Sequence, residues 1–274
     1  MDYIQLALGF LIAAVIAAVA RRLRALNTSG ALAAWLLGTV VFGLGGLPWA
    51  LVLMMFFVTS SGLSKLFKYR KQVIEINNEK GSQRDAWQVA ANGGMAGLAV
   101  LFHLVFPGSV YPWVAFASAF AAANADTWAT ELGFLNKTSP RSINSWKKMP
   151  AGTSGAVSLA GTLAAAAGAA VIGLTAWAFW PESPAVSQPK WMYALVIFGA
   201  GVLGSLVDSL LGATVQAVYW CPQCLKETEK SPLHTCGTPT SQRRGLRWVG
   251  NDLVNVACTT SGALLGLMLI LFFI

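Results

Sequence analysis

The sequence predicts an all-α integral membrane protein, a bundle of about eight transmembrane helices in a single domain, residues 1–274. Two observations lead to this fold class. Of the 274 residues, 55% are hydrophobic and 11% are charged, whereas a soluble domain carries about 25% charged residues. The hydrophobic residues also stand in long blocks instead of alternating with polar ones, as membrane-spanning helices require.

The hydrophobic blocks define eight predicted spans. In chain order they cover roughly residues 3–20, 29–43, 47–63, 87–106, 112–132, 153–180, 190–215 and 251–274. The second span is short for a bilayer, which suits a tilted, broken or partly interfacial helix. The sixth is long, and we expect its end near Trp177 and Trp180 at the membrane interface, where the amphipathic tryptophan ring is favoured.

The distribution of positive charge predicts the orientation in the membrane. The net charge is +8, and of the 19 Lys and Arg residues all but Lys190 follow the first, third, fifth or seventh span. Short loops rich in Lys and Arg stay in the cytoplasm. We therefore expect a multi-pass protein of the plasma membrane with both termini outside. Because this orientation accounts for the basic charge, we expect no nucleic-acid partner.

Four carboxylates lie in or against hydrophobic segments, near the predicted cytoplasmic ends of their spans. They are Asp126, Glu131, Asp208 and Asp252. A charge at the bilayer centre costs about 3 kcal/mol or more. One interpretation is that these residues end their helices and pair with loop lysines, since structural ion pairs are common. We favour a polar cavity open to the cytoplasm, because the four occur together with Asn and Thr neighbours.

Helical periodicity places polar residues of three spans on shared faces. The three sets are Asn124, Thr127 and Glu131; Ser205, Asp208 and Gly212; and Asp252, Asn255 and Thr259. Several carboxylates in one cavity would repel one another, and a divalent cation relieves that repulsion. Mg²⁺ is usually held by one or two carboxylates together with substrate phosphates. The spacing therefore indicates a magnesium site at Asp126 with Glu131 or Asp208, and an anionic substrate.

The loop before the sixth span carries basic residues followed by small ones. Lys147 and Lys148 suit the oxygens of phosphate groups. Gly152, Thr153 and Ser154 fall at the predicted start of the sixth span, where free N–H groups and the positive end of the helix dipole favour phosphate. An ordinary helix cap with small residues for close packing gives the same pattern. Together with the lysines, the pattern indicates a phosphate cradle.

Three cysteines and a histidine lie between the last two spans. Cys221, Cys224, His234 and Cys236 follow the pattern C-x₂-C-x₉-H-x-C. Zn²⁺ favours a closed tetrahedral Cys₃His set, and the reducing cytoplasm disfavours a disulfide. Because such a set leaves no open coordination position, we expect a structural zinc in a small zinc-knuckle-like cytoplasmic insertion, residues 218–248.

Five motifs, spread over nearly the whole chain, resemble those of one membrane family. They are RDAWQVAANGG at 84–94, NADTWATELG at 124–133, PAGTSG at 150–155, GSLVDSLLGATVQ at 204–216 and GNDLVN at 250–255. They are similar to membrane family ninety-two of the domains of unknown function, which includes plant phytyl-phosphate kinase. The pattern is also similar, more distantly, to CTP-dependent dolichol and phytol kinases and to CDP-archaeol synthase. The cysteine–histidine loop departs from the plant and animal members.

The resemblance implies an isoprenoid-phosphate kinase that moves a phosphoryl group from a nucleoside triphosphate, CTP by similarity, to a prenyl or phytyl monophosphate. The catalytic residues it implies are Asp126, Glu131, Lys147, Lys148, Asp208 and Asp252. The residues it implies as binding nucleotide or substrate are Arg84, Asn92, Asn124, Thr127, Gly152, Thr153, Ser154, Gln216, Asn251 and Asn255. The expected cofactors are Mg²⁺ and structural Zn²⁺, and the expected partners are the nucleotide, the isoprenoid phosphate and membrane lipid.

Two alternatives remain open at this point. A CTP-dependent lipid cytidylyltransferase would use the same set of residues and move CMP instead of phosphate. An ion-coupled transporter would use the acidic residues as ion or proton sites, but transporters usually place such sites near the bilayer midplane. The position of the carboxylates at one end of the spans favours an enzyme. The sequence also leaves open whether the chain forms a homo-oligomer.

Overall fold

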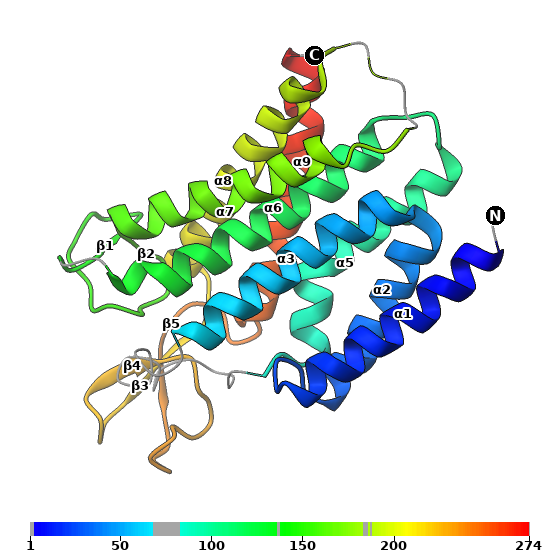
Figure 1. Ribbon diagram of the computed structural model, residues 1–274. Helices are drawn as coiled ribbons and strands as arrows, with labels where there is room; N and C mark the ends of the chain where they lie inside the picture. Colours follow the sequence, from blue (N-terminus) through cyan, green and yellow to red (C-terminus); the bar gives the residue numbers. More distant parts are fainter. Residues whose placement is uncertain (1–2, 68–82, 136–137, 183–185, 187, 274) are drawn as a thin grey trace.

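The computed structural model describes residues 3–273 except 68–82, 136–137, 183–185 and 187 (Figure 1). Within these residues, eight helices of at least 18 residues form a bundle. They are α1 (Tyr3–Arg22), α2 (Thr28–Gly45), α3 (Leu47–Leu66), α5 (Ala86–Val105), α6 (Tyr111–Leu132), α7 (Leu159–Ala178), α8 (Lys190–Thr214) and α9 (Asn251–Phe273). The predicted all-α architecture is confirmed, and each predicted span corresponds to one helix.

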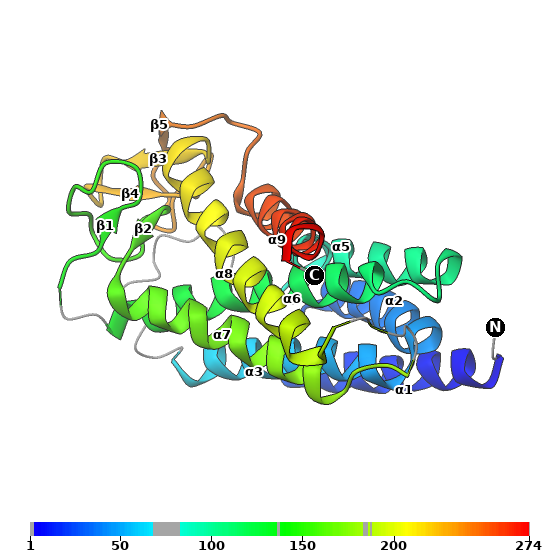
Figure 2. The ribbon, with the colours of Figure 1, turned by 90° about the horizontal axis from the view of Figure 1, so that it is seen from above.

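Helix α6 forms the centre of the bundle. The other seven long helices are each long and apolar enough to cross a membrane. By contrast, every residue of α6 from Pro112 to Ala125 is buried, and α3, α5, α7, α8 and α9 surround it (Figure 2). A helix surrounded by protein has little contact with lipid. It can therefore carry many alanines, which lower its hydropathy and let its neighbours approach closely.

Small residues bring α8 against α6. A Cβ atom added to Gly204 of α8 would lie 2.7 Å from the Cβ atom of Ala122 on α6. Any larger residue at position 204 would push the two helices apart, as expected for helix packing in membranes, where interfaces use small residues. This close approach matters for the site, because Asp208 lies one turn further along α8.

Two small antiparallel sheets lie at one end of the bundle, away from both termini (Figure 1). In the first, β1 (Arg141–Ser142) pairs with β2 (Ala156–Val157). In the second, the strand order is β4 (Lys226–Thr228), β3 (Val218–Cys221), β5 (Ser241–Arg244). A single 3₁₀ turn, η2 (Gly133–Leu135), follows α6. Of the basic residues behind the predicted orientation, Lys68, Arg70, Lys71, Lys80 and Lys137 lie outside the described residues.

Two of the helices that enter the bundle from this end, α5 and α7, have polar caps. Asp85 caps α5 by accepting a hydrogen bond from the Gln88 backbone N–H (2.9 Å), and the Gln88 side chain accepts one in return from the Asp85 N–H (3.1 Å). Ser158 caps α7 by accepting from the Gly161 N–H. The predicted start of the sixth span at residue 153 is therefore wrong. Gly152 and Gly155 have positive φ angles, which an α-helix excludes.

Candidate active site

A polar cavity of about 470 Å³ lies at the strand-bearing end of the bundle. Side chains from α3, α5, α6, α7, α8 and α9 and from the connecting loops line it. All four predicted carboxylates, Asp126, Glu131, Asp208 and Asp252, are among them. The predicted binding residues that also line it are Arg84, Asn92, Thr127, Gly152, Thr153, Ser154, Gln216, Asn251 and Asn255. Residues from all five motifs, which are far apart in the sequence, thus meet around one space.

The central feature of the cavity is a pair of carboxyl groups. Asp126 of α6 and Asp208 of α8 both line the cavity, close enough for the two carboxyl groups to interact electrostatically. Two carboxylates this close cannot both stay ionised unless a proton or a cation lies between them. The Oδ2 atom of Asp208 is buried and has no hydrogen-bond partner among the described residues. Leaving a buried oxygen unsatisfied is costly, and a hard cation such as Mg²⁺ would satisfy it.

A half-buried cation lies on another wall of the cavity. The Arg84 guanidinium donates a hydrogen bond from Nη1 to Ser60 Oγ (3.2 Å), and its central carbon lies 5.6 Å from the centre of the Phe56 ring. Burial lowers the pKa of Arg84, and the negative charge of Glu131 opposes that shift. Arginine nevertheless stays protonated in proteins. Glu131 itself accepts a 2.6 Å hydrogen bond from Ser64 Oγ.

The Gly152–Ser154 segment lines the cavity as a loop and not as a helix end. Its neighbour Gly155 is held against α8, since a Cβ atom added there would lie 2.3 Å from the backbone nitrogen of Ala213. Arg244, from β5, fixes the same place by donating to the carbonyl oxygens of Ser154 (3.0 Å) and Gly212 (2.7 Å). Backbone N–H groups of this loop can still meet an anion, but the dipole of α7 does not reinforce them.

Three predicted residues do not line the cavity. Lys147 and Lys148 are exposed near the β1–β2 pair, where the Lys147 carbonyl oxygen accepts from the Ser142 N–H. Asn124 is buried one turn further into α6. Its side chain donates to the Gly168 carbonyl oxygen (2.8 Å) and accepts from Thr59 Oγ1 (3.1 Å), so it ties α6 to α7 and α3. Asn124 therefore supports the position of the site without reaching it.

Several residues that line the cavity were not anticipated from the sequence. Glu229 and Lys230 reach it from the cysteine-containing loop. The Glu229 Oε1 atom accepts hydrogen bonds from Ser154 Oγ (2.6 Å) and from Gln216 Nε2 (2.8 Å). Ser64, Gln88 and Ser209 also line it. For Gln88, the sequence carried a signal in the motif at 84–94, whereas nothing in the local spacing marks Glu229 or Lys230.

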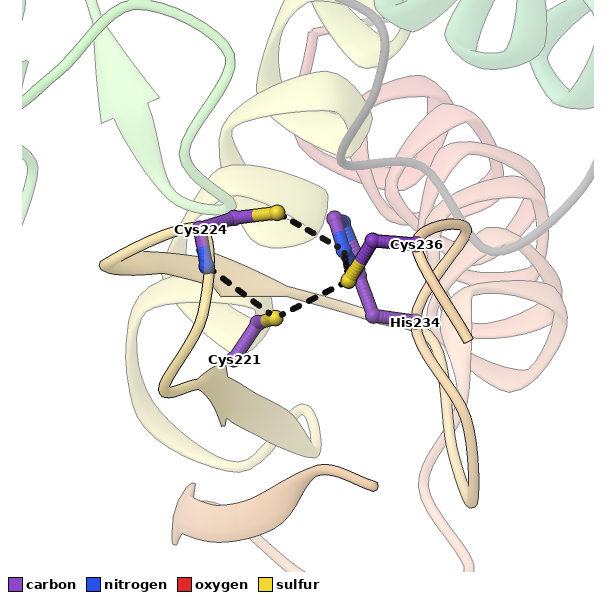
Figure 3. A group of neighbouring side chains, drawn as sticks. All are labelled: Cys221, Cys224, His234 and Cys236. Atoms are coloured by element: carbon purple, nitrogen blue, oxygen red, sulfur yellow. Dashed lines mark hydrogen bonds between the residues drawn. The ribbon is translucent and has the colours of Figure 1, made fainter. Parts of the chain in front are cut away.

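Cys221, Cys224, His234 and Cys236 form a tight cluster beside the cavity (Figure 3). One ligand atom from each lies within 4.8 Å of all the others. The Cys221 and Cys236 sulfurs are 3.6 Å apart, and His234 Nδ1 lies 3.4 Å from Cys224 Sγ and 3.2 Å from Cys236 Sγ. Ligand atoms around a tetrahedral zinc are roughly 3.5–3.8 Å apart, given Zn–S and Zn–N distances of about 2.3 and 2.0 Å. The donor set therefore fits zinc.

Interactions within the cluster shift the pKa values of two of its thiols in opposite directions. Contacts with Thr238, and then with His234, lower the pKa of Cys236 to about 5. Hydrogen bonding to Cys236, followed by burial and by Cys221, raises the pKa of Cys224 to about 11. The Cys224 N–H also donates to Cys221 Sγ at 3.5 Å. Metal binding would release the remaining thiol protons.

The model of the integral membrane protein family DUF92 matches residues 11–263. The chain belongs to this family. It is therefore a multi-pass integral membrane protein, and the family resemblance found in its motifs is confirmed. No solved structure matches the chain.

Relatives of this DUF92 member include proteins of Arabidopsis thaliana and of Methanocaldococcus jannaschii. It is 32% identical to Protein PGR of Arabidopsis thaliana over 234 residues, which cover 79% of this chain and 81% of that protein. An uncharacterized membrane protein of Methanocaldococcus jannaschii is 26% identical over 266 residues, 97% of this chain and 94% of the relative. Protein VTE6, chloroplastic, of Arabidopsis thaliana is 24% identical over 253 residues, 89% of this chain and 65% of that protein.

Proposed function

We propose that this protein is an isoprenoid-phosphate kinase. It transfers the terminal phosphoryl group of a nucleoside triphosphate, with CTP as the favoured donor, to a prenyl or phytyl monophosphate and gives the diphosphate. The observation that carries the proposal is the pair of half-buried carboxyl groups, Asp126 and Asp208, in a polar cavity at one end of a membrane helix bundle. The motifs shared with phytyl-phosphate kinases support the same substrate class.

In this proposal the carboxylates organise a magnesium nucleotide. Asp126 and Asp208, with Glu131 nearby, would hold Mg²⁺, which when bound neutralises charge on the donor phosphates. Asn251, Asp252 and Asn255 at the start of α9 face the same space and would hold a second ion or the acceptor phosphate. The unsatisfied Oδ2 atom of Asp208 supports this arrangement, because a ligand from outside the protein would complete its contacts.

The phosphate groups need hydrogen-bond donors as well as metal. Gly152, Ser154 and Lys230 line the cavity wall, and we propose that the backbone N–H groups of the loop and the ammonium of Lys230 serve as these donors. Arg84 provides a second, half-buried positive charge on the α5 side. Lys147 and Lys148, which lie outside the cavity, would contribute long-range attraction for an anionic nucleotide and no direct contact.

The reaction itself requires little chemistry from the protein. An oxygen of the acceptor monophosphate attacks the terminal phosphorus of the donor, the bond from that phosphorus to the bridging oxygen breaks, and a nucleoside diphosphate leaves. The acceptor oxygen is already anionic, so no strong general base has to remove a proton. Phosphoryl transfer is accelerated mainly by positioning and by charge stabilisation. A cavity rich in carboxylates and cations but without a histidine among its lining residues suits that requirement.

The remaining features belong to the same proposal. Zn²⁺ at Cys221, Cys224, His234 and Cys236 would be structural and would hold the loop that carries Glu229 and Lys230 against the cavity. We also propose a plasma-membrane location with both termini outside and the cavity facing the cytoplasm, on the ground of the loop charge distribution.

The test is a transfer assay with purified protein in detergent. CTP labelled at either the α- or the γ-phosphorus is supplied with Mg²⁺ and a prenyl monophosphate, and the lipid products are separated. A kinase transfers γ-label into a lipid diphosphate, whereas a cytidylyltransferase transfers α-label into a CDP-lipid. A transporter transfers neither. The kinase proposal is abandoned if γ-label stays out of lipid with every nucleoside triphosphate supplied.

A further inference from the structure

An apolar groove runs alongside the polar cavity. It has a volume of about 310 Å³ and lies between α1, α2, α3 and α5. Its walls include Ile16 of α1, Ala34 and Leu37 of α2, Ala50 and Phe57 of α3, and Val89 of α5. Ile12 and Leu47 also line it and are 42% and 60% exposed. Since these helices lie in the membrane-spanning part of the chain, the groove borders the lipid.

The groove and the polar cavity meet at three residues. Arg84, Gln88 and Asn92 line both of them, and within the described part of the chain they are the only polar side chains that line the groove. Arg84 lies at the boundary, because its guanidinium bonds Ser60 and stacks over Phe56, a groove residue. The groove is therefore apolar along its length and ends in a cation and two amides that also face the carboxylates.

We infer that this groove holds the isoprenoid chain of the acceptor, with the acceptor phosphate at Arg84, Gln88 and Asn92. The inference rests on the proposed function for the identity of the occupant. An amphiphile with one apolar chain and an anionic head matches the apolar walls and the half-buried cation of Arg84 at their end. The shared residues bring that head to the edge of the cavity where the nucleotide would lie, so tail and reacting phosphate occupy adjoining spaces.

The length of the groove fits a chain that enters from the membrane. On α3 its lining runs from Leu47 to Phe57, which at 1.5 Å per residue is about 15 Å. Half of a hydrocarbon core about 30 Å thick is also about 15 Å. The groove is thus about as long as the hydrocarbon layer of one leaflet is thick, so the tail can remain in an apolar environment while its phosphate lies in the polar cavity.

The experiment is photo-crosslinking with a prenyl monophosphate that carries a diazirine near the end of its tail. Purified protein in nanodiscs is irradiated without nucleotide, and the labelled peptides are mapped by mass spectrometry. We expect label on α1, α2 and α3 that long-chain prenyl monophosphate displaces and phosphatidylglycerol does not. Label confined to other helices overturns the inference. Equal displacement of the probe by phosphatidylglycerol also overturns it, because the groove would then bind membrane lipids in general.

Two neighbouring alanines provide a matched pair of variants. Ala34 lines the groove, whereas Ala33 does not. Ala34→Phe should fill the groove and lower labelling at least about tenfold, since displaced methylene groups lose their burial; Ala33→Phe should stay within about twofold of wild type. Ala50→Phe repeats the block from the opposite wall if Ala34→Phe does not fold, as judged by thermal unfolding. Equal labelling in the groove variants and the control refutes the assignment.

This test is independent of the kinase assay. Displaceable label in the groove of a protein that transfers no phosphate would uphold the groove as a prenyl-phosphate site and remove the kinase function. Phosphate transfer with a tail labelled elsewhere, and with Ala34→Phe fully active on long-chain acceptors, would do the reverse.

Discussion

Asp208→Asn separates a metal ligand from a structural acid. The substitution keeps the size of the side chain and removes one negative charge from the pair with Asp126. Two unit charges 4 Å apart repel by about 4 kcal/mol at an effective dielectric constant of about 20. A proton kept by one of the two carboxyl groups already relieves part of that repulsion. Without Mg²⁺ we therefore expect the variant to be as stable as wild type or more stable, by up to about 4 kcal/mol.

Ligand binding should have the opposite outcome. Magnesium nucleotide at about 100 times its dissociation constant stabilises a protein by about 2.7 kcal/mol. For a chain of this size, each 1 kcal/mol shifts the Tm by about 2–4 °C, so wild type should gain roughly 5–10 °C. Asp208→Asn should lose most of that gain, because the Oδ2 atom without a partner among the described residues is then no longer an anionic ligand.

The assay is thermal unfolding in detergent, with and without Mg²⁺ and CTP. Glu182→Gln is the matched control, since Glu182 is exposed and does not line the cavity; it should behave as wild type in both conditions. If Asp208→Asn is destabilised without Mg²⁺ and keeps the full ligand-dependent rise, Asp208 is a structural acid and the magnesium assignment is wrong.

Three further predictions concern the loop and the topology. Protein purified without chelator should hold one zinc per chain, and Cys221→Ser should lose it by elemental analysis; metal-free wild type would exclude the site. Glu229→Ala should lower the free energy of unfolding by about 1–3 kcal/mol, because the buried Gln216 side chain loses its hydrogen-bond acceptor. The control Glu182→Ala, at an exposed position, should change the free energy of unfolding by less than about 0.5 kcal/mol. Equal effects of the two substitutions would show that Glu229 does not bind the loop to the cavity wall. Gly108→Cys should react with a membrane-impermeant thiol reagent added to intact cells. If the cysteine at position 108 does not react, the orientation in the membrane is the opposite of the proposed one.

Much of the fold followed from the sequence because lipid imposes strong rules. A helix in a bilayer needs about 20 apolar residues, so the hydrophobic blocks located all eight helices. The four carboxylates were predictable because a charge beside lipid is costly, and periodicity then assigned Thr127 and Asn255 to the same cavity. Asn124 satisfied the same periodicity but lies one turn deeper, where it bonds α3 and α7.

The loop conformations depend on local backbone angles and on contacts between distant residues, and they were harder to predict from the sequence. Gly152 and Gly155 take positive φ angles, so the small-residue segment forms a turn where a helix start was expected. The approach of Glu229 depends on the fold of the cysteine loop and on its contact with Ser154, 75 residues away in the chain. The spacing of residues within the loop does not indicate such a contact. The apolar groove likewise arises from the packing of four helices, each of which looks like any other membrane span in sequence.

The most direct test of the kinase proposal is the rate of γ-phosphoryl transfer to a prenyl monophosphate by wild type and by Asp126→Asn. The thermal stability of both is measured in the same preparations, with Glu182→Gln as the control acid. We predict a well-folded Asp126→Asn variant that loses about 10²-fold or more in rate, as other charge-stabilising groups do. A well-folded Asp126→Asn variant that transfers phosphate at the wild-type rate would remove Asp126 from the site and contradict the proposed mechanism.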